Sequence, residues 1–380
     1  INKDILIIAG GQAATMHATQ SLAAGVDVVV RDEGEFAFRE VIERFSSGSR
    51  DFSGIGGITF RKEGELHSTE RRPMIQHLDD LPLPAWDLMP RLKSKFFPNT
   101  YASVIESSRG CPFHCNFCAV QSFWQRSYRK KSNTRIVEEV EHLTRRMGCE
   151  QVYFIDDSFA LNVREYTELF EMMLQRGLRV RGFSQIRPDT VANNPEMIRL
   201  AARVGFWGFM VGFDSYDDQE LKSVSKTGGK EINDRAARIL RENGIGIFGV
   251  HMFGMPGARS GSFATTFRYG MGNSDTFRMS RFSLIPGTPL FNELSARGEV
   301  EERADRYVPY SHKVKMSPAQ LRQYNLLYIW YEFRSLLGFG ALVSFLRSRG
   351  IARVLKWRAY VVAVRYVAYL FLRKIGLPAL

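Results

Sequence analysis

The first 71 residues alternate between short apolar runs and stretches with helical spacing. Residues 4–9 and 26–30 are apolar runs, and the first ends at Gly10–Gly11, a pair typical of a turn after a strand. Residues 35–45 repeat apolar side chains with the period of a helix, and so does the stretch between the two apolar runs. This βαβα order favours part of a parallel, doubly wound sheet.

A hairpin and a linker are expected next. Residues 57–69 predict two strands around a turn at Glu63–Gly64. Residues 72–100 contain Pro82, Pro84 and Pro90, which exclude a long helix there, so we interpret this stretch as a linker.

Residues 101–300 repeat a unit of strand, loop and helix. Six such units predict a parallel, curved sheet with helices outside, and a closed barrel would need eight. The expected fold is therefore α/β, with a partial (β/α)6 TIM-like barrel whose chemistry lies at the carboxyl ends of the strands. The expected strands are 102–108, 151–155, 179–185, 207–213, 245–253 and 278–285.

Residues 301–380 form a basic, apolar region in which 317–375 have helical spacing. Residues 321–375 hold ten basic residues and one acid, and so carry +9 of the chain's net charge of +12. The longest charge-free run there, 335–346, has 12 residues, which is short of the ~20 that a spanning helix needs. Two interpretations stay open: helices packed on the open side of the barrel, or a helix lying on an anionic membrane surface.

Composition narrows the class of protein further. The 380 residues are 44% hydrophobic and 24% charged, as in globular proteins. Four cysteines, three of them clustered, fit a metal site in a reducing compartment better than a disulfide framework, so a cytoplasmic protein is expected. The chain begins with Ile1 on an expected strand and shows no signal peptide, so we interpret it as a fragment or a processed chain.

The three clustered cysteines, Cys111, Cys115 and Cys118, have the spacing C-x3-C-x2-C in a loop after the first barrel strand. Three thiolates can ligate three irons of a cubane cluster and leave the fourth iron open to another ligand. The alternatives are a zinc site that includes His114 and cysteines without a metal. The fourth cysteine, Cys149, is expected to be a small buried side chain.

This loop resembles that of the radical S-adenosylmethionine (SAM) superfamily, and the resemblance extends over about residues 100–290. The matching segments are SSRGCPFHCNFCAV, FIDDSF, GFDSYDDQELKSVSKTG, MFGMPG and LIPGTPLF, in the order of that family. The resemblance implies a [4Fe–4S] cluster on Cys111, Cys115 and Cys118. It also implies that SAM binds the open iron and is cleaved to methionine and a 5'-deoxyadenosyl radical, which abstracts hydrogen from a substrate.

The same resemblance implies which residues contact SAM. Phe117 should lie near the adenine, and Asp156 and Asp157 near the amino group. Gln185 and Arg187 end the third strand and face the same site. Three further residues match the family pattern, but a direct contact with SAM is less clearly implied for them. Asp214 stands where the family has Glu, and Ser215 follows it. Lys226 would be a cation for the SAM carboxylate. The alternatives for these residues are helix caps and exposed charges.

The N-terminal 71 residues resemble the second half of the Rossmann-like cobalamin-binding (B12-binding) domain that precedes some radical SAM cores. Gly10 and Gly11 would approach the nucleotide tail of cobalamin. Gln12, Ala13 and Asp32 depart from the pattern, and the D-x-H-x-x-G motif that supplies a cobalt ligand does not occur. We therefore expect cobalamin binding by the intact parent protein and only weak binding by this chain.

The stretch 110–143 is most similar to the branch that contains the anaerobic magnesium-protoporphyrin IX monomethyl ester cyclase. That similarity implies an apolar substrate, a tetrapyrrole or a lipid, and an electron donor of flavodoxin or ferredoxin type. The reaction is expected to be cobalamin-dependent oxidative cyclisation, with radical C-methylation as the alternative. A non-enzymatic iron–sulfur carrier fits less well, and so does a zinc module that uses the basic run 123–131 for nucleic acid. No nucleic-acid partner is expected.

Overall fold

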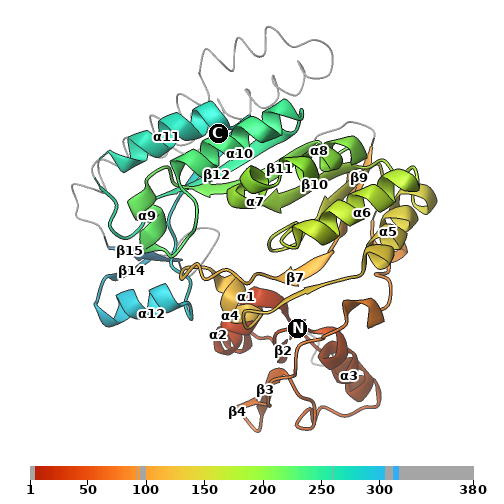
Figure 1. Cartoon of the computed structure of the whole chain (residues 1–380). Helices are drawn as coiled ribbons and strands as arrows, with labels where there is room; N and C mark the ends of the chain where they lie inside the picture. Colours follow the sequence, from red (N-terminus) through yellow and green to blue (C-terminus); the bar gives the residue numbers. More distant parts are fainter. Residues whose placement is uncertain (1–4, 91, 95–99, 260, 304–310, 316–380) are drawn as a thin grey trace, which may run out of the picture. The chain divides into compact units, whose positions relative to one another are not determined.

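The computed structural model describes residues 5–90, 92–94, 100–259, 261–303 and 311–315 (Figure 1). The chain divides into two units, residues 1–314 and 315–380, and the second lies outside the described residues except for Lys315. The predicted helical tail and its membrane-surface helix therefore also lie outside them. In the part that is described, no helix has the length and apolar character needed to cross a membrane.

The N-terminal region forms a four-stranded sheet in the order β1-β2-β3-β4. The first two strands are parallel and β3 and β4 are added antiparallel, so the predicted βαβα unit and hairpin are both present. A small core lies on this sheet, in which Val28, Val41 and Ile58 are fully buried. The elements are β1 Ile8–Ala9, α1 Gly11–Met16, α2 Ala18–Ala23, β2 Val28–Val30, α3 Glu35–Ser46, β3 Ile58–Lys62 and β4 Glu65–Ser68.

The central sheet has seven strands in the order β13-β12-β11-β10-β9-β6-β5. All neighbouring pairs are parallel except β5 and β6. The order ends at β13 and β5 without closing, so the predicted partial barrel of six parallel strands is confirmed. The strands are β5 Leu92–Lys93, β6 Tyr101–Ile105, β9 Gln151–Phe154, β10 Arg181–Ile186, β11 Gly208–Asp214, β12 Gly246–Phe253 and β13 Thr276–Arg281.

Helices cover the outer face of this sheet (Figure 1). A close-packed aromatic core fills the space between the two layers, and the ring centroid of Phe206 lies 5.4 Å from those of Phe154, Phe170 and Phe209. Gly182 has to lack a side chain, because a Cβ atom there would lie 2.7 Å from the Phe206 ring. The helices are α5 Asn133–Glu141, α6 Val163–Gln175, α7 Pro188–Asn193, α8 Pro195–Val204, α9 Asp218–Ser223, α10 Lys230–Glu242 and α11 Ser262–Asn273, and α5 continues as a π-helical turn, η3 His142–Arg146.

Shorter elements join these layers. Trp86 is buried and its indole donates a hydrogen bond of 3.1 Å to the Val104 carbonyl, so the predicted linker packs on the barrel. Cys149 is buried in the barrel core, as predicted. Ahead of the predicted helical stretch 317–375, the C-terminal region begins with an antiparallel strand pair, β14 and β15. The remaining elements are η1 Leu78–Asp80, η2 Trp86–Leu88, β7 Ser108–Gly110, α4 Ala119–Phe123, β8 Tyr128–Lys130, α12 Pro289–Ala296, β14 Val300–Arg303 and β15 Ser311–Val314.

Candidate functional site

The cysteine loop lies between the two strands of the β7–β8 hairpin and begins directly after Gly110. Gly110 has a φ of 86°, and a Cβ atom there would lie 2.0 Å from the Ser127 carbonyl oxygen, so no other residue fits. Its backbone N–H donates a 3.0 Å hydrogen bond to Oδ2 of Asp157. Asn116 ties the far side of the loop to the barrel, since its N–H donates to the Val224 carbonyl (3.2 Å).

Cys115 is buried, and Cys111 and Cys118 are partly buried. Burial raises the pKa of Cys118 to about 11 and also raises that of Cys111, so neither is an activated nucleophile at neutral pH. Cys115 lies close enough to both of these thiols to contribute to the rise of their pKa values, and Cys111 contributes to that of Cys118. A bound iron would favour the deprotonated form of each.

The donor set fits a cluster. In the described residues, no three His, Cys, Asp or Glu side chains converge closely enough to ligate a single ion. A cubane cluster does not require that convergence, because each of its three thiolates binds a different iron. The neighbouring thiols Cys111, Cys115 and Cys118 therefore suit a [4Fe–4S] cluster with one open iron.

A cavity of about 190 Å³ lies beside the loop, at the carboxyl ends of β9 to β12. Four residues that the sequence predicted for the SAM site meet in its lining: Asp157, Gln185, Arg187 and Lys226. Gln185 fixes the chain around it, because its Nε2 donates to the Asp156 carbonyl (2.7 Å) and to the Asp157 carbonyl (3.0 Å). The other lining residues are Ser158, Ile186, Met210, Gly212 and Val250.

Arg187 connects the cavity to the cysteine loop. Its guanidinium pairs with Asp189 (2.7 Å) and donates to the Thr227 hydroxyl (2.6 Å). The same group lies 3.6 Å from the centre of the Phe113 ring and has Nη1 3.9 Å from Sγ of Cys115. This cation is therefore fixed in position between the loop and the cavity.

Lys226 pairs with Asp214, and both side chains are almost fully buried. Lys226 also donates a 2.6 Å hydrogen bond to the Gly212 carbonyl. Asp214 has a φ of 60°, a conformation that few non-glycine residues adopt. Lys226 therefore lines the cavity while it neutralises a buried carboxylate.

Asp156 is placed differently from its neighbour. Its carboxylate is buried and accepts hydrogen bonds from the Ser107 hydroxyl (2.9 Å), the Ser108 hydroxyl (2.8 Å) and the Ser108 N–H. Burial raises the pKa of Asp156 to about 6, and these hydrogen bonds oppose the shift. Its side chain thus holds the chain between β6 and β7, and its backbone carbonyl faces Gln185.

Two further predicted residues have contacts away from the cavity lining. Phe117 packs edge-on against Phe282, with 5.5 Å between ring centroids. Ser215 is fully buried, and its hydroxyl donates to Glu220 (2.5 Å) and lies 3.2 Å from the Thr266 hydroxyl. The positive φ of Asp214 turns Ser215 toward α9 and α11. Their roles toward SAM stay predictions.

The sequence interpretation did not include Ser158. This residue lines the cavity, and its buried hydroxyl has no hydrogen-bond partner among the described residues. A buried hydroxyl without a partner is costly, so a ligand in the cavity is the natural partner. Its position directly after Asp156–Asp157 is the feature of the sequence that could have indicated Ser158 as a site residue.

The predicted cobalamin contacts lie at the carboxyl end of β1. Gly10 precedes α1, and Gly11 has a φ of 82° with open space where a Cβ atom would stand. A ligand can therefore approach this backbone closely. The chain has no D-x-H-x-x-G motif to add an axial histidine.

The basic run 123–131 is largely used inside the protein. The side chains of Arg129, Lys130 and Lys131 are each 5–7% exposed, and all three form ion pairs. Ser132 caps α5 by accepting the Arg135 N–H (3.1 Å). These three cations are therefore used in ion pairs within the protein.

Residues 105–269 match the sequence model of the radical SAM superfamily. The chain carries a radical SAM domain. The cofactors of this superfamily are a [4Fe–4S] cluster and SAM, which agrees with what the resemblance of the cysteine loop implied.

Curated relatives of this chain are named as enzymes. An uncharacterised methyltransferase of Pyrococcus horikoshii is 27% identical over 294 residues, which cover 77% of this chain and 63% of the relative. An anaerobic magnesium-protoporphyrin IX monomethyl ester cyclase of Synechocystis is 29% identical over 245 residues, covering 64% and 48%. The chain thus spans about half to two thirds of these relatives' lengths.

Solved structures share the fold. The cobalamin-dependent SAM radical enzyme OxsB with aqua-cobalamin bound aligns with a TM-score of 0.72 at 14% identity, over 97% of this chain and 60% of that one. The radical SAM methyltransferase TsrM of Kitasatospora setae, with cobalamin and a [4Fe–4S] cluster bound, aligns with a TM-score of 0.62 at 20% identity, over 79% and 60%. The radical SAM domain with its N-terminal region therefore has the architecture of these enzymes.

Proposed function

We propose that the protein is a radical SAM enzyme whose cluster binds Cys111, Cys115 and Cys118 and whose SAM occupies the adjoining cavity. The observation that carries this proposal is the meeting of Asp157, Gln185, Arg187 and Lys226 in one cavity beside the cysteine loop. When bound, the cluster supplies the electron that cleaves SAM to methionine and a 5'-deoxyadenosyl radical.

The residues of this chain bind and orient SAM. Gln185 holds the Asp156 and Asp157 carbonyls in place at the end of β9, where the SAM amino group would bind. Arg187 and Lys226, which pair with Asp189 and Asp214, would donate further hydrogen bonds to the SAM carboxylate. Ser158 offers an unpaired hydroxyl to the same ligand.

An apolar substrate is supported by the inner face of the barrel. Met210 lines the cavity and is 39% exposed, and Ile155 at the end of β9 is 55% exposed. Apolar side chains left open to solvent beside a reaction centre suit a ligand that covers them. Relatives include the cyclase named above and the hopanoid C-3 methylase of Methylococcus capsulatus, so the proposed substrate class is a tetrapyrrole or a lipid.

The proposed reaction is oxidative cyclisation with cobalamin bound by the intact protein, and C-methylation is the second candidate. Relatives named as methyltransferases support the second candidate. Cobalamin would lie at the Gly10–Gly11 edge, which is open to a ligand but supplies no histidine. These 380 residues should therefore bind it weakly, and tight stoichiometric binding would contradict this expectation.

A labelled-SAM assay separates the two reactions. Reconstituted protein is given methyl-labelled SAM, a reductant and cell extract under anaerobic conditions. Cyclisation yields 5'-deoxyadenosine and a product without label, whereas methyl transfer carries the label into the product. If SAM is not cleaved by protein that holds its cluster, the proposed function is wrong.

We also propose a cytoplasmic enzyme that takes electrons from a flavodoxin or a ferredoxin and contacts membranes through residues 321–375. The +9 charge of that stretch supports binding to anionic vesicles, with each cation contributing about 1 kcal/mol. Flotation of the full chain with anionic vesicles should be salt-sensitive. Equal flotation of a version truncated after Met316 would refute the role of the tail.

A further inference from the structure

The carboxylate of Glu33 is almost fully buried and joins three separate segments of the chain. It lies in the loop between β2 and α3, and its side chain is 4% exposed. It pairs with Arg109 Nη1 (2.7 Å) and Arg129 Nη1 (2.8 Å), and it accepts the N–H of Ile75 (2.6 Å). One N-terminal side chain is thus bound both to the linker and to the β7–β8 hairpin.

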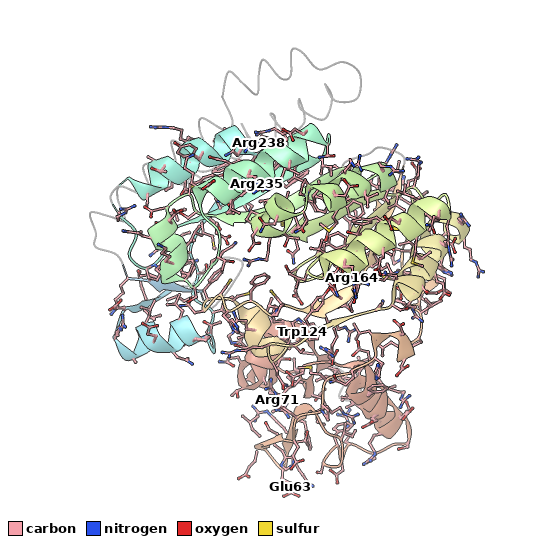
Figure 2. The ribbon with its side chains drawn as sticks, in the orientation of Figure 1. Glu63, Arg71, Trp124, Arg164, Arg235 and Arg238 are labelled. Carbon is pink, nitrogen blue, oxygen red and sulfur yellow. The ribbon has the colours of Figure 1, made fainter. Side chains whose placement is uncertain are left out.

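The two arginines belong to the hairpin that carries the cysteine loop. Arg109 lies directly opposite Arg129 in the β7–β8 register and two residues before Cys111. The indole of Trp124, seen in Figure 2, lies 5.8 Å from the Arg109 guanidinium and 5.4 Å from that of Arg129. Two facing buried cations repel each other, and a carboxylate between them removes that repulsion.

Arg109 is held on three sides. Besides Glu33, its guanidinium pairs with Glu35 (2.6 Å) and its Nε with Glu106 (2.7 Å). The direction of the chain as it enters Gly110 and Cys111 is therefore set by an ion network centred on this arginine. Two of the three carboxylates in that network come from the N-terminal region.

The other end of the loop is held by the same region. Cys118 immediately precedes α4, and α4 packs against α1 of the N-terminal sheet. Figure 1 shows these two helices next to each other. Both ends of the cysteine loop thus contact residues 11–35.

We propose that Glu33 is a positioning residue for the iron–sulfur cluster, acting through Arg109 and Arg129 on the loop that holds Cys111. This inference rests on the proposed function, since it presumes that the loop binds a cluster. The N-terminal region is then a working part of the cluster site in addition to any cofactor site of its own. Residues that orient metal ligands from outside the ligand set commonly change metal retention when they are replaced.

The test compares two Glu→Gln variants in the full chain after anaerobic reconstitution. Glu33→Gln removes the charge between the two arginines, and Glu40→Gln removes a carboxylate of α3 that pairs with Arg72 away from the loop. The readouts are the rate of iron release to a chelator and the EPR g-values of the reduced cluster. We expect Glu33→Gln to release iron about tenfold faster and to shift the g-values. Glu40→Gln should match the wild type in both.

Wild-type iron release and an unchanged EPR spectrum in folded Glu33→Gln protein would overturn the inference. Circular dichroism establishes folding, and if Glu33→Gln does not fold, Arg109→Lys takes its place. That variant keeps the positive charge but loses the three-way fork of the guanidinium, and the same criteria apply to it. A wild-type chain that takes up no cluster would refute the proposed function itself, and this result is distinct from a stable cluster in the variants.

Discussion

The two faces of the barrel sheet differ sharply in packing. Phe209 and Met210 are adjacent on β11, yet Phe209 is fully buried under the helices and Met210 is 39% exposed in the cavity lining. On the outer face, aromatic rings lie 5–6 Å apart in a close-packed layer. On the inner face, at the carboxyl ends of the strands, charged, polar and apolar side chains together line open space. The comparison indicates that the outer face carries stability and the inner face carries chemistry, and that the two can be altered separately.

The largest loss of stability should come from a substitution on the outer face. Phe209→Ala leaves a cavity between β11 and the helices and should lower the free energy of unfolding by about 3–5 kcal/mol. Denaturant unfolding followed by circular dichroism measures it. A loss below about 1 kcal/mol would contradict the close packing of this layer.

The free energy of unfolding should depend on pH through His251. This residue is fully buried on the outer face of β12, between the rings of Phe213, Tyr216 and Phe277. Burial lowers its pKa from 6.5 to about 4, with Asp214 opposing and Lys226 reinforcing the shift. The neutral form is favoured in the folded state, so its contribution to stability is present above pH 6.5 and is lost as the pH falls toward about 4.

That pKa shift of His251 corresponds to a loss of about 3 kcal/mol in the free energy of unfolding between pH 7 and pH 4. The variant His251→Leu should not show this loss. The difference in unfolding free energy between wild type and variant therefore separates the contribution of His251 from that of other titrating groups. Asp156 has the opposite sign, because its raised pKa weakens the fold as the pH rises through about 6. Parallel stability profiles for wild type and His251→Leu would show that His251 does not titrate as inferred.

A smaller effect is expected for Ser158 on the inner face. Replacing it with Ala removes one hydrogen-bonding group from the cavity and should weaken SAM binding by about 1 kcal/mol, roughly fivefold. Calorimetry with SAM on the reconstituted protein measures this change, and the unfolding free energy should stay within about 0.5 kcal/mol. Unchanged SAM affinity would place SAM away from this hydroxyl.

The smallest effect on stability is expected for Met210→Ala, one residue from Phe209. Its side chain is already partly exposed, so the unfolding free energy should change by about 1 kcal/mol or less. Formation of 5'-deoxyadenosine without substrate should persist, while turnover of an apolar substrate should fall. A loss of stability equal to that of Phe209→Ala would remove the distinction between the two faces.

Local patterns predicted most of the fold. The six barrel strands follow runs of apolar residues, and the hairpin around Glu63–Gly64 follows a turn whose two residues both adopt positive φ. The resemblance to the radical SAM superfamily also indicated Asp157, Gln185, Arg187 and Lys226, which line one cavity at the strand ends. Such features depend on near neighbours and on the common edge of parallel strands.

Other features depend on contacts that no local pattern reports. Asp156 is directed inward by hydroxyls 48 and 49 positions earlier in the chain, and Ser215 is turned away from the cavity by the backbone of Asp214. Glu33 meets Arg109 across 76 positions, and nothing in either segment indicates the partner. The strand pair β14–β15 formed where basic and acidic residues gave no periodic signal.

The measurement that tests the central claim most directly is the iron and sulfide content of anaerobically reconstituted protein, followed by SAM cleavage. The wild type should hold about four irons and four sulfides per chain and convert SAM to 5'-deoxyadenosine with a reductant. Cys115→Ala should lose both properties, and Cys149→Ala, outside the loop, should keep both. Stoichiometric zinc without iron uptake, or SAM cleavage that survives Cys115→Ala, would contradict the account.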